Sequence, residues 1–600
     1  MLRSAVLLLA FAAPALLAGE ALPLADVRPG MQGVGRTVFE GARVDEFGVR
    51  ILGVLENAVG PRQSLILARL EGGPLAETGV IAGMSGSPVF VDGKLVGAVA
   101  YAFPFGKEPI AGITPIGDMV AAAESTAPRA ASARLHTPDH AAPLDRAAVA
   151  AAFRRPLRSL LPGAFRGEAL PPAVTGAALS PLALPLVFSG FEPDTFDWAR
   201  GVFSTMGFAP VMGGGGAAAP GPVPDLAPGA AVGVSLVEGD LDLSVTGTIT
   251  YIDRGRVYAF GHPFYNLGPT RFPLKKAWVY SVFPSLQVSW KIAAALDAVG
   301  TMDQDRTTTI SGFLGDAPRM IPVEVRLRSP RASERTFRFR VVEDELFTPL
   351  LGYVSLLSVL QGHERAMGAA TLRLDARLAL AGGREVRLHD VVAGEQPAQQ
   401  AAAALAGPLA LLVGNDFEQV TLEGLSVSVD AAETLETATI VRVWVDGPLP
   451  LRPGTVAPVK VQLRTHRGET VTESLSVSVP PSAPTGTYTL LVADATTMDA
   501  IEQREMGPAG GARDLDHLLR KLNRLRTGSR VYARLTRPGG GAVVGGEYLP
   551  SLPGSVLSVL GSADQGTAVV RLPASAVWSG ELATDRAVSG WRQVNVPVER

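Results

Sequence analysis

The sequence predicts a mainly β protein of several domains, and three observations indicate this fold class. The chain has 600 residues, which at roughly 100 to 200 residues per domain corresponds to about three to five structural units. It contains 66 glycines and 47 prolines, the residues that interrupt helices and supply turn geometry. Between these turns, apolar and polar residues alternate over long stretches, as in half-buried strands. We therefore expect short strands joined by turns.

Composition and charge exclude several classes of function. The 54 Lys and Arg residues against 57 Asp and Glu leave a net charge of -3, which gives no long-range attraction to nucleic acid or anionic lipid. The chain has no cysteine, which excludes disulfides, thiol nucleophiles and thiolate metal sites. It also has no His-Glu-x-x-His motif and no carboxylate loop of the calcium-binding type. We therefore expect no nucleic-acid partner, no metal and no cofactor.

The first residues of the chain have the features of a signal peptide. Arg3 supplies a basic start, residues 5–17 form an apolar segment, and small residues at 16–18 or 19–21 offer a cleavage site. The apolar segment is shorter than the ~20 residues that cross a bilayer, and no later stretch is long enough. We therefore expect residues 1–21 to direct export to the periplasm or the extracellular side of a bacterial envelope, with no transmembrane span after cleavage.

The rest of the chain divides into four segments of different composition. Residues 22–124 alternate apolar and polar positions between turns and predict a first β unit. Residues 125–228 are rich in Ala, Pro and Gly and predict a connector with a small folded insert, a strand followed by a short helix. Residues 229–369 predict a second β unit. Residues 370–600 have the evenly spaced short strands of an immunoglobulin-like β-sandwich, together with a short helix.

A candidate nucleophile lies in the stretch "GMSGSPVFVDGKLVGAVAYAF", residues 83–103. A serine hydroxyl becomes a useful nucleophile when an imidazole accepts its proton and backbone N–H groups bind the developing oxyanion. Glycines around Ser85 allow a sharp turn, and the N–H groups of Gly83 and Ser85 can point into one pocket. Ser87, in the same turn, is interpreted as structural. The alternative, a purely structural turn before a strand, remains open on this stretch alone.

One histidine has a setting that suits proton transfer. His262 follows the strand-like "RVYAF" and is flanked by Gly261 and Pro263, and the proline favours an extended backbone at the histidine. The other six lie in the connector or in helical and charged contexts where a solvated histidine is expected. They are His136, His140, His363, His389, His466 and His517.

The two stretches together resemble one peptidase family. "GMSGSPVFVDGKLVGAVAYAF" resembles the serine region of the SpoIVB-type serine peptidases, peptidase family S55, and "GTITYIDRGRVYAFGHPF" resembles their histidine region. The resemblance covers about residues 65–118 and 235–316. It implies a chymotrypsin-like two-barrel core assembled from two separated segments, with Ser85 as nucleophile, His262 as general base, and the N–H groups of Gly83 and Ser85 as oxyanion hole. In that family the histidine segment precedes the serine segment, so the halves are permuted here.

The acid that would orient the imidazole is open among three alternatives. The family has an aspartate shortly before its serine, and the nearest match here is Glu71 in "LILARLEGGPL". Asp253, on the turn before the histidine strand, is an alternative. The third alternative is that no carboxylate fills this role.

These features lead to one leading hypothesis and two alternatives. The leading hypothesis is an exported serine endopeptidase that cleaves a protein substrate of the envelope by acyl-enzyme chemistry without a cofactor. The first alternative is a non-catalytic, peptidase-like protein that binds or assembles envelope components. The second is a surface protein in which both motifs are only turns. The sequence makes no prediction of the oligomeric state.

Overall fold

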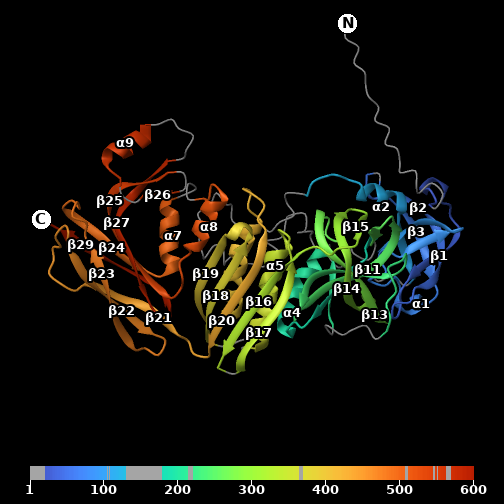
Figure 1. Cartoon of the computed structure of the whole chain (residues 1–600), viewed down its shortest axis with the longest axis horizontal. Coiled ribbons are helices and arrows are strands. Elements are labelled where there is room, and N and C mark those ends of the chain that lie inside the picture. The colour runs from blue at the N-terminus through green and yellow to red at the C-terminus, as the bar shows by residue number, and fades with distance from the viewer. Residues whose placement is uncertain are drawn as a thin grey trace, which may run out of the picture.

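A computed structural model shows a mainly β fold (Figure 1). It describes residues 21–61, 63–103, 106, 108–129, 179–213, 221–330, 332–363, 369–506, 511–544, 547–549, 552–562 and 569–600. Strands account for 53% and helices for 19% of the described residues, which confirms the mainly β fold class. The predicted signal peptide, apart from its last residue, and most of the predicted connector lie outside the described residues.

The first β unit is a closed barrel of six described strands. Hydrogen-bonded neighbours follow the order β4-β1-β2-β3-β6-β5, and a β4–β5 pairing closes the ring. The strands are β1 (Gln32–Thr37), β2 (Asp45–Gly60), β3 (Gln63–Glu71), β4 (Pro88–Val91), β5 (Lys94–Ala102) and β6 (Ile110–Pro115). Their inward residues form one apolar core that includes Phe47, Ile66 and Ile113. The short elements η1 (Leu24–Asp26), α1 (Leu75–Thr78), α2 (Ile116–Ala123) and β7 (Ser180–Pro181) complete this unit.

The second β unit contains another closed ring of six described strands. Their order is β10-β13-β14-β15-β12-β11, and β10 pairs with β11 to close it. They are β10 (Ala231–Gly239), β11 (Asp242–Asp253), β12 (Arg256–Ala259), β13 (Gly268–Phe283), β14 (Trp290–Arg306) and β15 (Thr309–Leu314). The two rings confirm the expected chymotrypsin-like two-barrel core assembled from two separated segments.

The expected insert in the connector is a strand followed by a short helix. It consists of β8 (Leu184–Ser189), α4 (Pro193–Phe203), η5 (Ser204–Met206) and β9 (Phe208–Met212). Strand β8 pairs with β11, and β9 pairs in parallel with β8, so the insert extends the sheet of the second barrel.

A sheet covered by two apolar helices continues from the second barrel. Its strands are β16 (Met320–Ser329), β17 (Ala332–Val342), β18 (Ala370–Leu380), β19 (Glu385–Gly394) and β20 (Leu422–Ala432), with η6 (Ala381–Gly383) between β18 and β19. The helices are α5 (Phe347–His363) and α6 (Pro397–Val413), and both belong to the core they share with these strands. Since β20 pairs with both β16 and β18, the sheet does not divide at residue 370, where the sequence suggested a boundary. In the part of the chain that the structure describes, no helix is long and apolar enough to cross a membrane.

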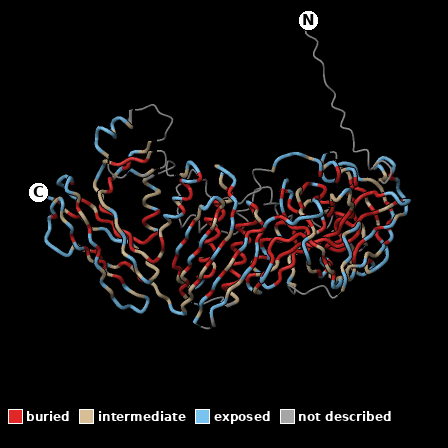
Figure 2. The backbone as a smooth tube through the Cα atoms, viewed as in Figure 1, coloured by how far each residue is buried: buried red, intermediate tan, exposed pale blue. Residues whose placement is uncertain are grey.

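Two smaller sheets around one core form the C-terminal sandwich. One contains β21 (Thr437–Val445), β22 (Val456–Thr465), β23 (Thr470–Ser478) and β28 (Ala587–Ser589). The other contains β24 (Gly486–Ala493), β25 (Arg530–Val544), β26 (Glu547–Leu549), β27 (Val569–Ala583) and β29 (Trp591–Val598). Helices α7 (Ala495–Met506), α8 (Leu515–Asn523) and α9 (Gly554–Ser562) accompany them. Figure 2 shows that buried backbone is densest in the barrels, at the end of the molecule opposite this sandwich.

Candidate active site

The turn that carries Ser85 is shaped for close contact with the second barrel. Gly83 and Gly86 have φ angles of +94° and +95°, a backbone conformation that favours glycine. At Gly86 a Cβ atom would lie 1.9 Å from the Thr248 carbonyl oxygen and 2.5 Å from the Phe260 nitrogen. The glycine is therefore needed because backbone of the second barrel lies directly against the turn.

Hydrogen bonds join the serine and histidine segments across the seam between the barrels. The Thr248 N–H donates to the Ser85 carbonyl (2.9 Å), and the Thr250 hydroxyl donates to the Gly86 carbonyl (2.8 Å). From the first barrel, the Thr114 hydroxyl donates to the carbonyl of Gly261, the residue before the histidine (2.6 Å). The serine and histidine segments thus contact each other.

Ser85 and His262 are both buried, with 0% and 2% of their surface exposed. Within the described residues, neither the Ser85 Oγ nor the His262 Nε2 has a hydrogen-bond partner, so these two atoms do not bond to each other in this structure. The His262 Nδ1 lies 2.9 Å from the Pro263 carbonyl oxygen. Because a carbonyl only accepts, Nδ1 carries the proton and Nε2 keeps a lone pair. Burial lowers the pKa of His262 to about 4, and the bond to Pro263 opposes this shift, so the ring is neutral near pH 7.

Two backbone N–H groups of the serine turn have no acceptor among the described residues: those of Gly83 and Ser85. The other amides of the turn are all bonded. The N–H groups of Met84, Gly86 and Ser87 donate to the carbonyls of Ile81, Val99 and Met84. An available pair of amides beside a serine hydroxyl is what an oxyanion requires.

The peptide groups that carry these two amides are fixed by hydrogen bonds to their carbonyl oxygens. The Lys291 N–H donates to the Ala82 carbonyl (3.1 Å), and a trans peptide directs the Gly83 N–H to the opposite side. Ser87 donates to the Met84 carbonyl through its N–H (2.9 Å) and its hydroxyl (2.6 Å). Because the Met84–Ser85 peptide is trans, its N–H, that of Ser85, points to the side opposite this carbonyl. Ser87 is thus bonded within the turn through both its N–H and its hydroxyl.

A buried lysine lies behind the turn and was not found by sequence reasoning. The Lys291 Nζ is 2.8 Å from the Thr37 Oγ1 and 3.4 Å from the Thr248 Oγ1, and no surface of this residue is exposed. Burial lowers its pKa to about 7, and the charge of Asp45 opposes this shift. Its side chain packs on Gly83, where a Cβ would lie 3.2 Å from the lysine Cδ. The sequence places Lys291 among alternating strand residues and contains no signal that this position faces inward.

The structure does not bring either predicted carboxylate to the imidazole. Glu71 is an exposed residue at the end of β3, opposite Gly48, and Asp253 is a half-buried residue at the end of β11. Within the described part of the chain, His262 bonds at Nδ1 to the Pro263 carbonyl and has no partner at Nε2, so it makes no hydrogen bond to Glu71 or Asp253.

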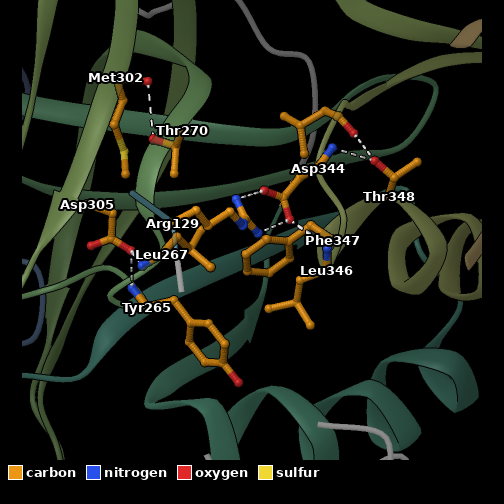
Figure 3. A network of polar contacts seen from close by, with 11 residues as sticks. Arg129, Tyr265, Leu267, Thr270, Met302, Asp305, Asp344, Leu346, Phe347 and Thr348 are labelled. Carbon is orange, nitrogen blue, oxygen red and sulfur yellow. Dashed lines mark hydrogen bonds and ion pairs between the residues drawn. The ribbon is translucent and has the colours of Figure 1, made fainter. Parts of the chain in front are cut away.

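A different carboxylate holds the loop that follows the histidine. Asp305, at the end of β14, accepts the N–H of Phe264 at Oδ1 (2.8 Å) and those of Tyr265 (2.8 Å) and Leu267 (2.9 Å) at Oδ2. Figure 3 shows Asp305 beside Tyr265 and Leu267. The carboxylate is fully buried; burial raises its pKa to about 6, and the three N–H donors and Arg129 oppose the shift. Sequence reasoning missed Asp305, because nothing distinguishes it there from the other acids of "VGTMDQDRTTTISGFLG".

Among the described histidines, His517 is also buried and its Nδ1 has no hydrogen-bond partner, so the expectation that this histidine is solvated is wrong. His389 pairs with Asp375 on the surface (2.6 Å), and His517 is buried in α8, whereas His136 and His140 lie outside the described residues. Across the described ranges, no group of three or more His, Cys, Asp or Glu side chains is placed to hold a metal ion.

Comparison with known families and structures bears on the first barrel. Residues 22–114 match the family model of the SpoIVB peptidase S55. The match spans the first barrel and the turn with Ser85, and it ends before the histidine segment. It supports the resemblance inferred from the serine motif and an S55-type serine peptidase as the general class. No curated protein and no solved structure matches the chain.

Proposed function

We propose that the protein is an exported serine endopeptidase with Ser85 as nucleophile and His262 as general base. The observation that carries this proposal is a pair of amides, Gly83 N–H and Ser85 N–H, beside the buried Ser85 hydroxyl. Among the described residues the amides have no acceptor and the hydroxyl has no partner. The family match over residues 22–114 and the two-barrel core support the same class of enzyme.

The chemistry follows from the free atoms of the site. The Ser85 Oγ attacks the carbonyl carbon of a peptide bond, and the His262 Nε2 accepts the hydroxyl proton. The N–H groups of Gly83 and Ser85 bind the oxygen that becomes negative. His262 then gives the proton to the leaving amine, and a water molecule that His262 deprotonates hydrolyses the acyl-enzyme to restore the serine.

The burial of the site makes this enzyme latent in the conformation described. The Ser85 side chain has no exposed surface, so a peptide reaches it only after the residues that cover the seam move apart. We expect a slow basal reaction that accelerates when the two barrels separate slightly or when a bound partner opens the seam.

The substrate and location are parts of the same proposal. The apolar N-terminal segment supports export across the inner membrane of a bacterial envelope, and the peptidase class supports a protein or peptide substrate there. The C-terminal sandwich, built on its own core, is available to bind substrate or partner.

Labelling with a fluorophosphonate probe tests the proposal. The parent protein should form a covalent adduct, Ser85→Ala should form none, and His262→Ala should react far more slowly. Ser87→Ala is the matched control in the same turn and should still be labelled. Equal labelling of all four proteins would refute catalysis at this site, and loss of labelling in Ser87→Ala alone would assign the nucleophile to Ser87.

A non-catalytic peptidase-like binding protein is the second candidate function. The complete burial of Ser85 and the absence of a Ser85–His262 hydrogen bond favour it. No labelling of the folded parent, even with a long exposure at mildly denaturing urea concentrations that loosen the seam, would support this candidate.

A further inference from the structure

The imidazole of His262 is oriented by a backbone carbonyl, and that carbonyl belongs to a peptide group whose other end is also engaged. The Pro263 carbonyl oxygen lies 2.9 Å from the His262 Nδ1. The N–H of the same peptide group is that of Phe264, which donates to the Asp305 Oδ1 at 2.8 Å. One peptide group therefore connects a carboxylate to the imidazole.

The geometry of a trans peptide makes the two contacts dependent on each other. The Pro263–Phe264 bond is trans, so its carbonyl and its N–H point in opposite directions within one plane. When Asp305 fixes the direction of the N–H, it also fixes the direction of the carbonyl that faces Nδ1. Hydrogen bonds in such a chain polarise one another, and an N–H bonded to a carboxylate makes its carbonyl a better acceptor.

We propose that Asp305 is the positioning residue for His262, acting through the Pro263–Phe264 peptide group. This inference rests on the proposed function, because the orientation of the ring matters for catalysis only if His262 is the base. Asp305 would hold the Nδ1–H tautomer and leave the Nε2 lone pair for the serine proton. Its role is the one that the sequence analysis considered for Glu71 or Asp253, carried out one peptide group away from the ring.

The surroundings of Asp305 favour this specific role. Its two oxygens accept three N–H groups of the five residues that follow His262, so the loop cannot rotate without breaking charge-assisted bonds. The side chain is fully buried. Burying a carboxylate costs free energy of folding unless the charge is paired or hydrogen-bonded, and here the three N–H donors supply these bonds.

Arg129 offsets a small part of the effect of burial on Asp305, whose pKa stays raised. Its guanidinium forms a two-pronged ion pair with Asp344 (2.7 and 3.1 Å) and lies near enough to Asp305 to favour the ionised form (Figure 3). Its Cα packs against Gly268, at the end of the loop, where a Cβ would lie 3.2 Å away. Arg129, which follows the first barrel in the chain, thus contacts the loop that follows His262.

The test replaces Asp305 by asparagine and reads the state of the His262 ring directly. Asparagine has the same shape but presents one NH₂ group to N–H donors that need acceptors. In protein labelled with ¹⁵N-histidine, the parent should show the Nδ1–H tautomer of His262, assigned by the spectrum of His262→Gln. Asp305→Asn should show a mixture of tautomers and a kcat lower by about 10- to 100-fold with little change in KM. The matched control is Asp303→Asn, a half-buried acid on the same strand that pairs with Arg256, which should leave both readouts unchanged.

A second measurement needs no variant and covers the case in which Asp305→Asn does not fold. In the parent, the His262 Nδ1–H signal should move with an apparent pKa of about 6, the value to which burial raises Asp305, well above the pKa of the ring itself. A Nδ1–H signal that ignores this transition, or an unchanged tautomer and kcat in a folded Asp305→Asn protein, would overturn the inference. If the parent shows the tautomer effect but has no peptidase activity, the proposed function fails while the role of Asp305 in orienting the ring stands.

Discussion

Replacing Gly86 by alanine tests whether the two barrels meet at the serine turn as described. The added Cβ would lie 1.9 Å from the Thr248 carbonyl oxygen and 2.5 Å from the Phe260 nitrogen. Both are backbone atoms of the second barrel, which cannot move aside as a flexible side chain does. The barrels must therefore separate or the turn must distort.

The cost can be worked from two terms. At a φ of +95°, an alanine costs about 1–2 kcal/mol relative to glycine. Overpacking against fixed atoms adds about 1–3 kcal/mol, so Gly86→Ala should lower the free energy of unfolding by about 2–5 kcal/mol. Gly93→Ala is the matched control, because Gly93 has a φ of +77° and nothing within 4 Å of its Cβ position, so only the first term applies.

The assay is calorimetric unfolding combined with amide hydrogen exchange, since a chain of several domains does not unfold in one step. Gly86→Ala should lower the transition of the barrels by more than Gly93→Ala and should speed exchange in β11 and in the serine turn. If the two variants are destabilised equally, the second barrel does not lie against Gly86, and the juxtaposition of Ser85 and His262 is refuted.

Three further expectations concern the seam. Because burial lowers the pKa of His262 to about 4, protonation of this ring should not limit fluorophosphonate labelling above about pH 5. The measurement is made on Asp305→Asn, which lacks the carboxyl that titrates near 6, and a rate that still falls with the ordinary histidine pKa of 6.5 would contradict the expectation. The pKa of Lys291 is about 7 in the folded protein and 10.5 when exposed, so the unfolded chain binds more protons between these values and the free energy of unfolding rises with pH. Lys291→Met should lose this rise, and equal pH slopes in thermal unfolding would show that the lysine is not buried. Ser87→Ala removes the hydroxyl bond to the Met84 carbonyl and should lower the free energy of unfolding by about 1 kcal/mol. Ser85 should still be labelled, but more slowly, and an unchanged rate would mean that the hydroxyl is not needed to hold the turn.

The sequence was sufficient for features that depend on local pattern. Alternation and turn residues predicted the mainly β fold and the strand and helix of the insert, since each depends on residues close together in the chain. The glycines around Ser85 and the proline after His262 marked the two segments that meet at the seam. These signals are local because each reflects the backbone conformation of a few neighbouring residues.

Features that depend on distant contacts were not accessible in this way. Asp305 and Lys291 act on the backbone of Phe264 and Ala82, which lie far from them along the chain, and a carboxylate bonded to amides leaves no residue pattern. Alternation likewise indicates strands within residues 370–432 but not which sheet they join. Strand β20 pairs with β16, and β18 and β19 follow it in the same sheet, so these strands continue the sheet of the second barrel and the sandwich begins only after them.

Mapping the covalent adduct of a fluorophosphonate on the full-length protein is the most direct test of the central claim. Digestion and mass spectrometry should place the adduct on Ser85, within the peptide that contains "GMSGSP", and His262→Ala should reduce its yield strongly. An adduct on another residue, or none in a folded protein whose seam has been loosened, would contradict the account of Ser85 and His262 as a catalytic pair.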